Sequence, residues 1–135
     1  MRYFTTIFVL AALASTGCGS DDPVDIPSQP TPVTMTQTFD GTLTVNGAQT
    51  HNFAVERPGT VTAQVKTLSD QAATLGVSLG TWNGAACQII ISNTAAVLNT
   101  TVAGTATTVG QFCVWLNDVG KLTSGVDYSV DVTHY

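Results

Sequence analysis

The stretch GVSLGTWNGAACQIII, residues 76–91, decides the fold class of this chain. Its first half alternates, with Val77 and Leu79 on one face of an extended strand and Ser78 on the other. Asn83-Gly84 then predicts a two-residue hairpin turn, because asparagine and glycine tolerate the positive φ that such a turn needs. Residues 87–91 are apolar on both faces, and we expect them to form a central, buried strand. The order strand, hairpin, strand favours an all-β fold.

The same stretch contains the pattern Gly-x-Ser-x-Gly, which seats the nucleophile of many serine hydrolases. Residues of the matching acid and base types follow in hydrolase order: Asp118, Asp127, Asp131 and His134. In those enzymes, however, the serine occupies a sharp turn between a strand and a helix, whereas Ser78 lies inside an alternating strand. We therefore predict a protein without catalytic residues, with a small esterase using Ser78 as the alternative. Gly76 and Gly80 are expected to let the strand bend or a neighbouring backbone approach closely.

Alternating strands recur through the rest of the chain. They run from Thr38 to the C-terminus, separated by turn signals such as NGAQ, ERPG and NDVGKLTSG. With a weaker strand over residues 97–102 they number about eight, and no ten-residue window has a helical stripe. The pattern predicts one two-sheet antiparallel β-sandwich, jelly-roll-like, over residues 38–135. In this sandwich we expect His51 to be partly buried and His134 to be a terminal, solvent-facing residue.

The N-terminus has the pattern of a secretory signal. Residues 1–17 place Arg2 before an apolar run that is too short to span a bilayer. The run ends in STGC, which resembles the lipobox of bacterial lipoproteins, in which the cysteine becomes the lipidated N-terminus. We predict lipidation of Cys18, with ordinary cleavage after Ala14 as the alternative. We expect residues 18–37, which are rich in proline and aspartate, to form a disordered tether.

The cysteine count supports this interpretation. Three cysteines in a secreted chain leave one unpaired unless it is consumed elsewhere. Lipidation of Cys18 leaves Cys87 and Cys113, which outside the cytoplasm are expected to form a disulfide. Cys113 has the parity of the outer face, so we expect the bridge on an outer sheet face. A metal site would need more ligands than these two cysteines supply, and we predict none.

Net charge and side-chain chemistry restrict the classes of partner that this chain could bind. The net charge is −5, and loss of Arg2 with the signal leaves three basic against nine acidic residues, a net of −6, which argues against nucleic acid. No phosphate-binding loop or paired-histidine motif is present, so we predict no cofactor. Trp82, at the tip of the predicted hairpin, and Trp115, on the face opposite Val114, are the candidate binding surface for an envelope protein or polysaccharide. The alternative is that they fill gaps beneath loops.

Several segments together resemble a known family. FDGTLT, HNFAV, PGTVTAQV, GQFCVWLNDVG and YSVDVT look like successive strands of the bacterial pre-peptidase C-terminal (PPC) domain, a jelly-roll-like β-sandwich. The resemblance covers residues 38–135 and implies a non-catalytic module, carried by secreted enzymes or standing alone. It transfers no binding residue. We thus expect a membrane-anchored lipoprotein acting as a binding or structural module of the bacterial cell envelope, or an accessory module of a separately encoded secreted hydrolase.

Overall fold

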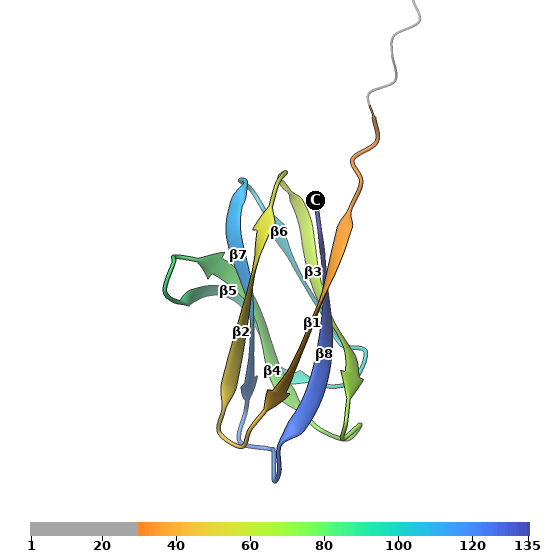
Figure 1. The fold of residues 1–135 in the computed structure, drawn as a ribbon, viewed down its shortest axis with the longest axis vertical. Coiled ribbons are helices and arrows are strands. Elements are labelled where there is room, and N and C mark those ends of the chain that lie inside the picture. Colours follow the sequence, from red (N-terminus) through yellow and green to blue (C-terminus); the bar gives the residue numbers. More distant parts are fainter. Residues whose placement is uncertain (1–29) are drawn as a thin grey trace, which may run out of the picture. The chain divides into compact units, whose positions relative to one another are not determined.

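A computed structural model describes residues 30–135, of which 31–135 form one compact unit. Within this part of the chain there are eight strands and no helix (Figure 1). They are β1 (Met35–Leu43), β2 (Ala48–Val55), β3 (Gly59–Leu68), β4 (Leu75–Trp82), β5 (Cys87–Ala96), β6 (Thr101–Ala106), β7 (Gly110–Asp118) and β8 (Val126–His134). The predicted all-β class is confirmed. The predicted signal, Cys18 and most of the tether lie outside the described residues.

The strands form two four-stranded antiparallel sheets in jelly-roll order. One sheet runs β1-β8-β3-β6 and the other β2-β7-β4-β5, so successive strands change sheet everywhere except in the β4–β5 hairpin. The edge strands β1 and β2 face each other across one open seam of the sandwich, and β5 and β6 across the other. The predicted two-sheet sandwich is therefore confirmed.

The core lies between the sheets and is built by the alternation seen in the sequence. In β4, Leu75 and Val77 are fully buried and Leu79 nearly so, and in β8 every second residue from Val126 to Val132 is buried. Each of these side chains, removed from water, stabilises the fold by about 1.5–3 kcal/mol before the entropy of ordering is counted. The inward strip of each strand thus holds the two sheets together.

Two element boundaries differ from the prediction. β1 begins at Met35, three residues before the expected start of the domain. The predicted strand over residues 97–102 is displaced, because residues 97–100 form a turn in which Asn99 has a φ of 67° and the Thr100 amide donates to the Val97 carbonyl. β6 therefore starts only at Thr101. Turn chemistry at Asn99 outweighed the weak alternation of that segment.

The prediction that residues 87–91 form a central buried strand is wrong. β5 is the edge strand of its sheet, and Ile89, Ile90 and Ile91 keep 46%, 72% and 38% of their surface exposed. An uninterrupted apolar run shows no preferred face, so the sequence could not distinguish a central strand from an edge strand with exposed apolar residues. The β4–β5 pairing also shifts register between Leu79 and Gly80, which displaces Ile90 from the ladder.

The prediction that His134 faces solvent is also wrong. It is the last residue of β8 and only 1% exposed, with its ring stacked on Phe53 at a centroid distance of 5.1 Å. His134 has the same parity as Tyr128, Val130 and Val132, all of which point inward. The alternation of β8 continues to its last residue and directs the His134 side chain inward, although the residue lies next to the C-terminus.

Candidate binding surface

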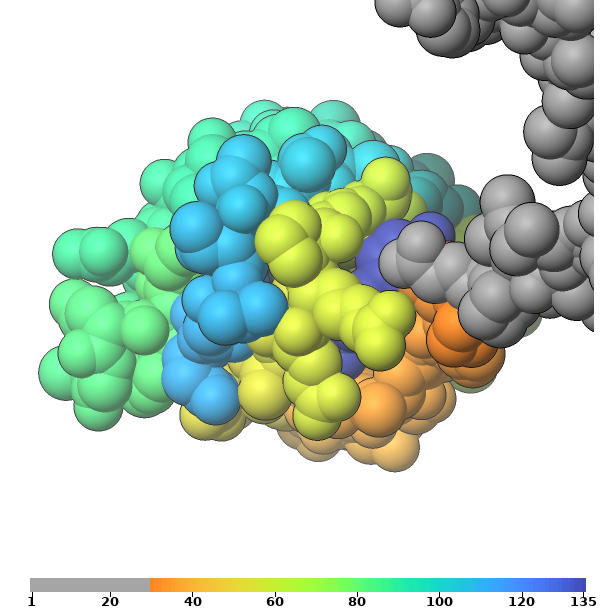
Figure 2. Space-filling model, turned by 90° about the horizontal axis from the view of Figure 1, so that it is seen from above, coloured from red at the N-terminus to blue at the C-terminus, as the bar shows by residue number. Residues whose placement is uncertain are grey.

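The β4–β5 hairpin projects from the side of the sandwich, as Figures 1 and 2 both show. Its loop is Asn83 to Ala86, two residues longer than the predicted turn. The Asn83 side-chain oxygen accepts the backbone N–H groups of Ala85 and Ala86 at 2.9 and 2.8 Å, and Gly84 has a φ of 97°. These bonds fix the loop locally, because an asparagine side chain can replace the backbone acceptor of a turn.

A disulfide fastens this hairpin to the sheet. Cys87, the first residue of β5, is bonded to Cys113 of β7, with 5.7 Å between the Cα atoms, so the predicted bridge is confirmed. Cys113 alternates with Val114 on β7 and lies on the outer face, yet it is fully buried. Because β4 lies between β5 and β7 in the sheet, the bridge reaches across the outer face of β4.

Gly80 makes this crossing feasible. It pairs with Cys113 on one side and Ile89 on the other, and a Cβ added to it would collide with the backbone carbonyl of Gln88. The β5 backbone therefore passes close over β4, as expected for a glycine inside a strand. By contrast, an added Cβ at Gly76 would meet the side chain of Asn117 rather than a backbone.

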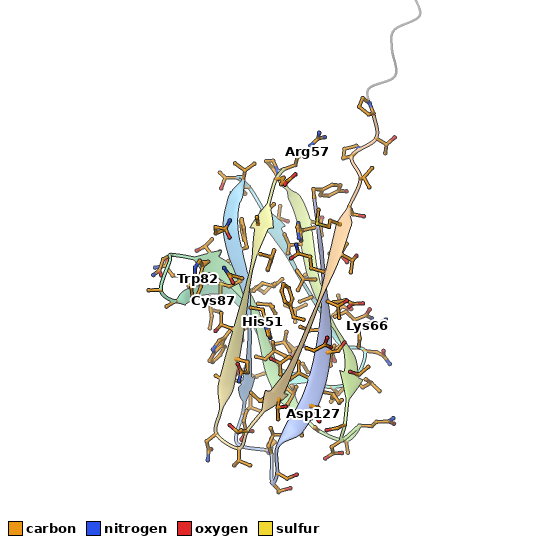
Figure 3. All side chains as sticks on the ribbon, in the orientation of Figure 1. His51, Arg57, Lys66, Trp82, Cys87 and Asp127 are labelled. Carbon is orange, nitrogen blue, oxygen red and sulfur yellow. A yellow bond between two sulfur atoms is a disulfide. The ribbon has the colours of Figure 1, made fainter. Side chains whose placement is uncertain are left out.

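Both tryptophans lie on the same outer face as the bridge. Trp115 stands directly opposite Ser78 in the β4–β7 register, and Trp82 is two residues beyond Gly80 on the same face of β4. Each is partly exposed. Figure 3 shows Trp82 and Cys87 together at the hairpin. The disulfide thus separates two amphipathic aromatic side chains on one surface.

The residues of the esterase alternative are not brought together. Ser78 is fully buried, and its hydroxyl forms a 2.8 Å hydrogen bond with the hydroxyl of Ser92 from β5. It belongs to the outer side of its sheet, whereas His134 comes from the other sheet and points into the core. No strand-to-helix turn surrounds Ser78 within the described residues.

The aspartates of that alternative have structural roles. Asp118 accepts backbone N–H groups from Asn46, Gly120, Lys121 and Leu122, and these bonds, that of Asn46 foremost, lower the pKa of its carboxyl group. Asp127 accepts the hydroxyl of Thr42 and Asp131 that of Thr38, each at 2.6 Å. All three therefore stabilise turns and strand pairs at separate places.

A polar pair closes the seam between β1 and β2. The Nε2 of His51 lies 2.7 Å from the hydroxyl of Tyr128, and its ring stacks on Phe39 at 5.0 Å. Burial lowers the pKa of His51, partly offset by the charge of Asp40, and raises the pKa of Tyr128 to about 12. His51 is thus the partly buried strand residue that was predicted. Its partner Tyr128 could not be inferred, because pairing across the seam depends on sheet order.

Sequence reasoning also missed a small apolar cavity at the other seam, between β5 and β6. It measures about 30 Å³, the space of roughly one water molecule. Its lining includes Phe53, Leu79, Ile90, Ile91, Gly104 and Phe112. Among the described residues, no group of three His, Cys, Asp or Glu side chains could hold a metal ion, and no helix could cross a bilayer.

Comparison with known proteins identifies the fold but no family. No protein-family model and no curated protein matches the chain. The mitogen of Yersinia pseudotuberculosis superposes with a TM-score of 0.58 at 16% identity, over 76% of this chain and 88% of the mitogen. PliG of Aeromonas hydrophila, a periplasmic inhibitor of g-type lysozyme, gives 0.54 at 13% identity, over 72% and 83%. At such identities the likeness establishes the sandwich alone, and the resemblance to the PPC family stays a prediction.

Proposed function

We propose that this chain is a lipid-anchored, non-catalytic binding module of the bacterial cell envelope, and that it recognises a protein partner through the β4–β5 hairpin. The observation that carries the proposal is the Cys87–Cys113 bridge, which fastens a projecting hairpin to β7. The disulfide joins the first residue of β5, directly after the loop, to the inner strand β7 of the same sheet. Such an arrangement stabilises a surface feature as well as the core.

Fixing the hairpin in advance favours binding. A flexible loop loses conformational entropy when a partner orders it, and this cost reduces affinity. Here the bridge holds one end of the loop and the side-chain bonds of Asn83 hold its tip. The loop is therefore already close to one conformation before it meets a partner.

The tryptophans supply the contact surface. Partly exposed indoles with an apolar ring and one N–H donor are frequent centres of protein interfaces. The projecting shape favours a partner with a concave site, which supports a protein more than a polysaccharide strand lying along a flat face. PliG of Aeromonas hydrophila, a sandwich of this architecture, is a periplasmic inhibitor of g-type lysozyme, so the architecture is compatible with recognition of another protein.

The cysteines support the proposed lipid anchor. Because Cys87 and Cys113 are bonded to each other, Cys18 is the one cysteine left of three, and it follows the apolar N-terminal run. Intact-mass measurement of protein extracted from its native membrane should find the mass of two or three acyl chains beyond that of the chain from Cys18, lost in Cys18→Ser. An unlipidated mass matching cleavage after Ala14 would contradict the anchor and leave the binding proposal to be judged separately.

Binding is tested by cross-linking in intact cells. A photoreactive p-benzoylphenylalanine placed at Ala85, on the exposed loop, should form one dominant covalent adduct with an envelope protein. The same residue placed at Val45, exposed in the β1–β2 turn, is the matched control. Equal adducts at both positions, or none at Ala85, would contradict recognition through the hairpin. An adduct of heterogeneous mass sensitive to glycan hydrolases would identify a polysaccharide as partner instead.

The enzymatic alternative is tested with the same protein. If an ester substrate is turned over and Ser78→Ala abolishes the turnover while the melting temperature is retained, the protein is a hydrolase. We expect no turnover that depends on Ser78, because its hydroxyl is buried and bonded to Ser92. The accessory-module alternative would be supported if the adduct at Ala85 contained a secreted hydrolase.

A further inference from the structure

The seam between β5 and β6 is an unprotected edge of the sandwich. β6 pairs with β3 over six consecutive positions without a register shift, and no other strand among residues 30–135 pairs with its second edge. Neither β5 nor β6 contains a charged residue or a proline. Proteins usually guard long regular edges with lysine, proline or a bulge, since unpaired N–H and C=O groups bind other strands.

The two edge strands of this seam differ in what they offer. β5 is interrupted where Ile90 is displaced from the ladder, so its backbone is a poor template for a further strand. β6 is regular, and its backbone can accept one. Two of the exposed isoleucines of β5, Ile90 and Ile91, line the same cavity as Gly104 of β6, and an added Cβ at Gly104 would come within 3.6 Å of Ile91.

A strand added to β6 would cover this apolar surface. In an antiparallel sheet the added strand would point alternate side chains inward, toward the cavity lined by Ile90, Ile91 and Phe112. Backbone pairing with β6 and burial of the isoleucines would then occur together. The required occupant is an extended, uncharged segment with small or β-branched side chains and a free edge of its own.

We propose that this occupant is β6 of a second copy of the chain, in a two-fold dimer that joins the two sheets edge to edge. The strand TVAGTA meets each of those requirements, and a two-fold axis pairs one surface with itself. With the axis at Ala103, Val102 lies opposite Gly104 of the partner copy, and Thr101 lies opposite Thr105. Each valine thus packs against a residue without a side chain, and the threonine side chains contact each other.

Charge supports the same occupant. The chain from residue 19 onward has three basic and nine acidic residues, a net charge of −6, so most encounters between two copies are repulsive. The two strands of this seam are free of charge, so the repulsion is weakest here. In the dimer Ile90 and Ile91 of both copies lie beneath the joined β6 strands. This proposal stands whether or not the hairpin binds a partner.

The test uses the chain from residue 19 to 135, which contains the whole compact unit and avoids the acyl chains. Sedimentation velocity over a range of concentrations should show a reversible monomer–dimer equilibrium. Ile90→Lys should weaken dimerisation roughly tenfold or more, because the apolar interface would have to bury an ammonium group from each copy. Val45→Lys, an equal change in the β1–β2 turn, should leave the equilibrium unchanged. Ile90 is mostly exposed, so its substitution leaves the core intact.

A cross-link locates the interface independently. Ala103→Cys on the exposed face of β6 should give a covalent dimer under mild oxidation, because paired strands place opposite Cα atoms about 4.5–5.5 Å apart. Thr36→Cys on β1, the other edge of the same sheet, is the control and should stay monomeric. A chain that remains monomeric at every concentration, a dimer indifferent to Ile90→Lys, or a covalent dimer through Thr36→Cys alone would each overturn the proposal.

Discussion

Removing the Cys87–Cys113 bridge should destabilise the domain by a predictable amount. The bridge closes a loop with a sequence separation of 26 residues. In the chain-entropy description, removing the bridge restores conformational entropy to the unfolded chain and lowers the free energy of unfolding by about 3.5 kcal/mol. For a domain of this size, near 4 °C per kcal/mol, the melting temperature should fall by roughly 14 °C.

The assay is urea and thermal unfolding of the Cys87→Ala/Cys113→Ala variant, followed by circular dichroism and by tryptophan fluorescence. Wild type unfolded in reducing buffer should reproduce the variant, and Cys18→Ser should match wild type, since the bridge does not involve it. Because Trp82 and Trp115 are on the face that the bridge crosses, their fluorescence should change more than the circular dichroism of the native state. A decrease in the free energy of unfolding below about 1 kcal/mol would refute the reasoning, because the bridge would then not restrict the unfolded chain as this description requires.

Substitutions at four further positions test the account of the fold. Gly80→Ala should cost about 2 kcal/mol or more in chemical unfolding, because its methyl group meets the backbone carbonyl of Gln88, whereas Gly104→Ala, with only ordinary contacts, should stay within about 1 kcal/mol. Burial lowers the folded-state pKa of His51, so the unfolded chain binds more protons between the two pKa values. Melting temperatures should therefore fall as the pH is lowered from 7.5 through the unfolded pKa near 6.5 toward the folded one, and His51→Gln should flatten that dependence. A pH dependence unchanged in His51→Gln would contradict this account. His134→Phe should be neutral or stabilising in thermal unfolding, because the buried Nε2 has no hydrogen-bond partner, while His134→Ala should cost about 3 kcal/mol by leaving a cavity against Phe53. Equal losses in both His134 variants would show that the imidazole contributes more than its packing.

The sequence predicted the parts of the fold that depend on neighbours along the chain. Alternation is local, so Val77, Leu79 and the strands around them could be assigned. The cysteine count, together with the predicted lipidation of Cys18, paired Cys87 with Cys113. The position of β5 at the edge depends on sheet order, which no local pattern encodes. Because Ile89–Ile91 show no alternation, the exposure of these side chains could not be predicted from the sequence.

The candidate surface was predictable only in part. Trp82 and Trp115 could be named from their places beside a turn and on an outer face, and Gly80 from its position inside a strand. The register shift in the β4–β5 pairing and the crossing of β4 by the bridge could not be predicted, because both depend on which strands are neighbours in the sheet. The apolar seam between β5 and β6 likewise joins strands from different sheets.

The affinity of the domain for the protein captured at Ala85 tests the central claim most directly. It should be measured by calorimetry with the chain of residues 19–135 as wild type and as Trp82→Ala, both checked for equal melting temperature. We predict that Trp82→Ala weakens binding by about thirtyfold, equivalent to about 2 kcal/mol at the centre of an interface, and that the partner is recovered chemically unchanged. Equal affinities for the two proteins, or conversion of the partner that Ser78→Ala abolishes, would contradict a non-catalytic module that binds through its hairpin.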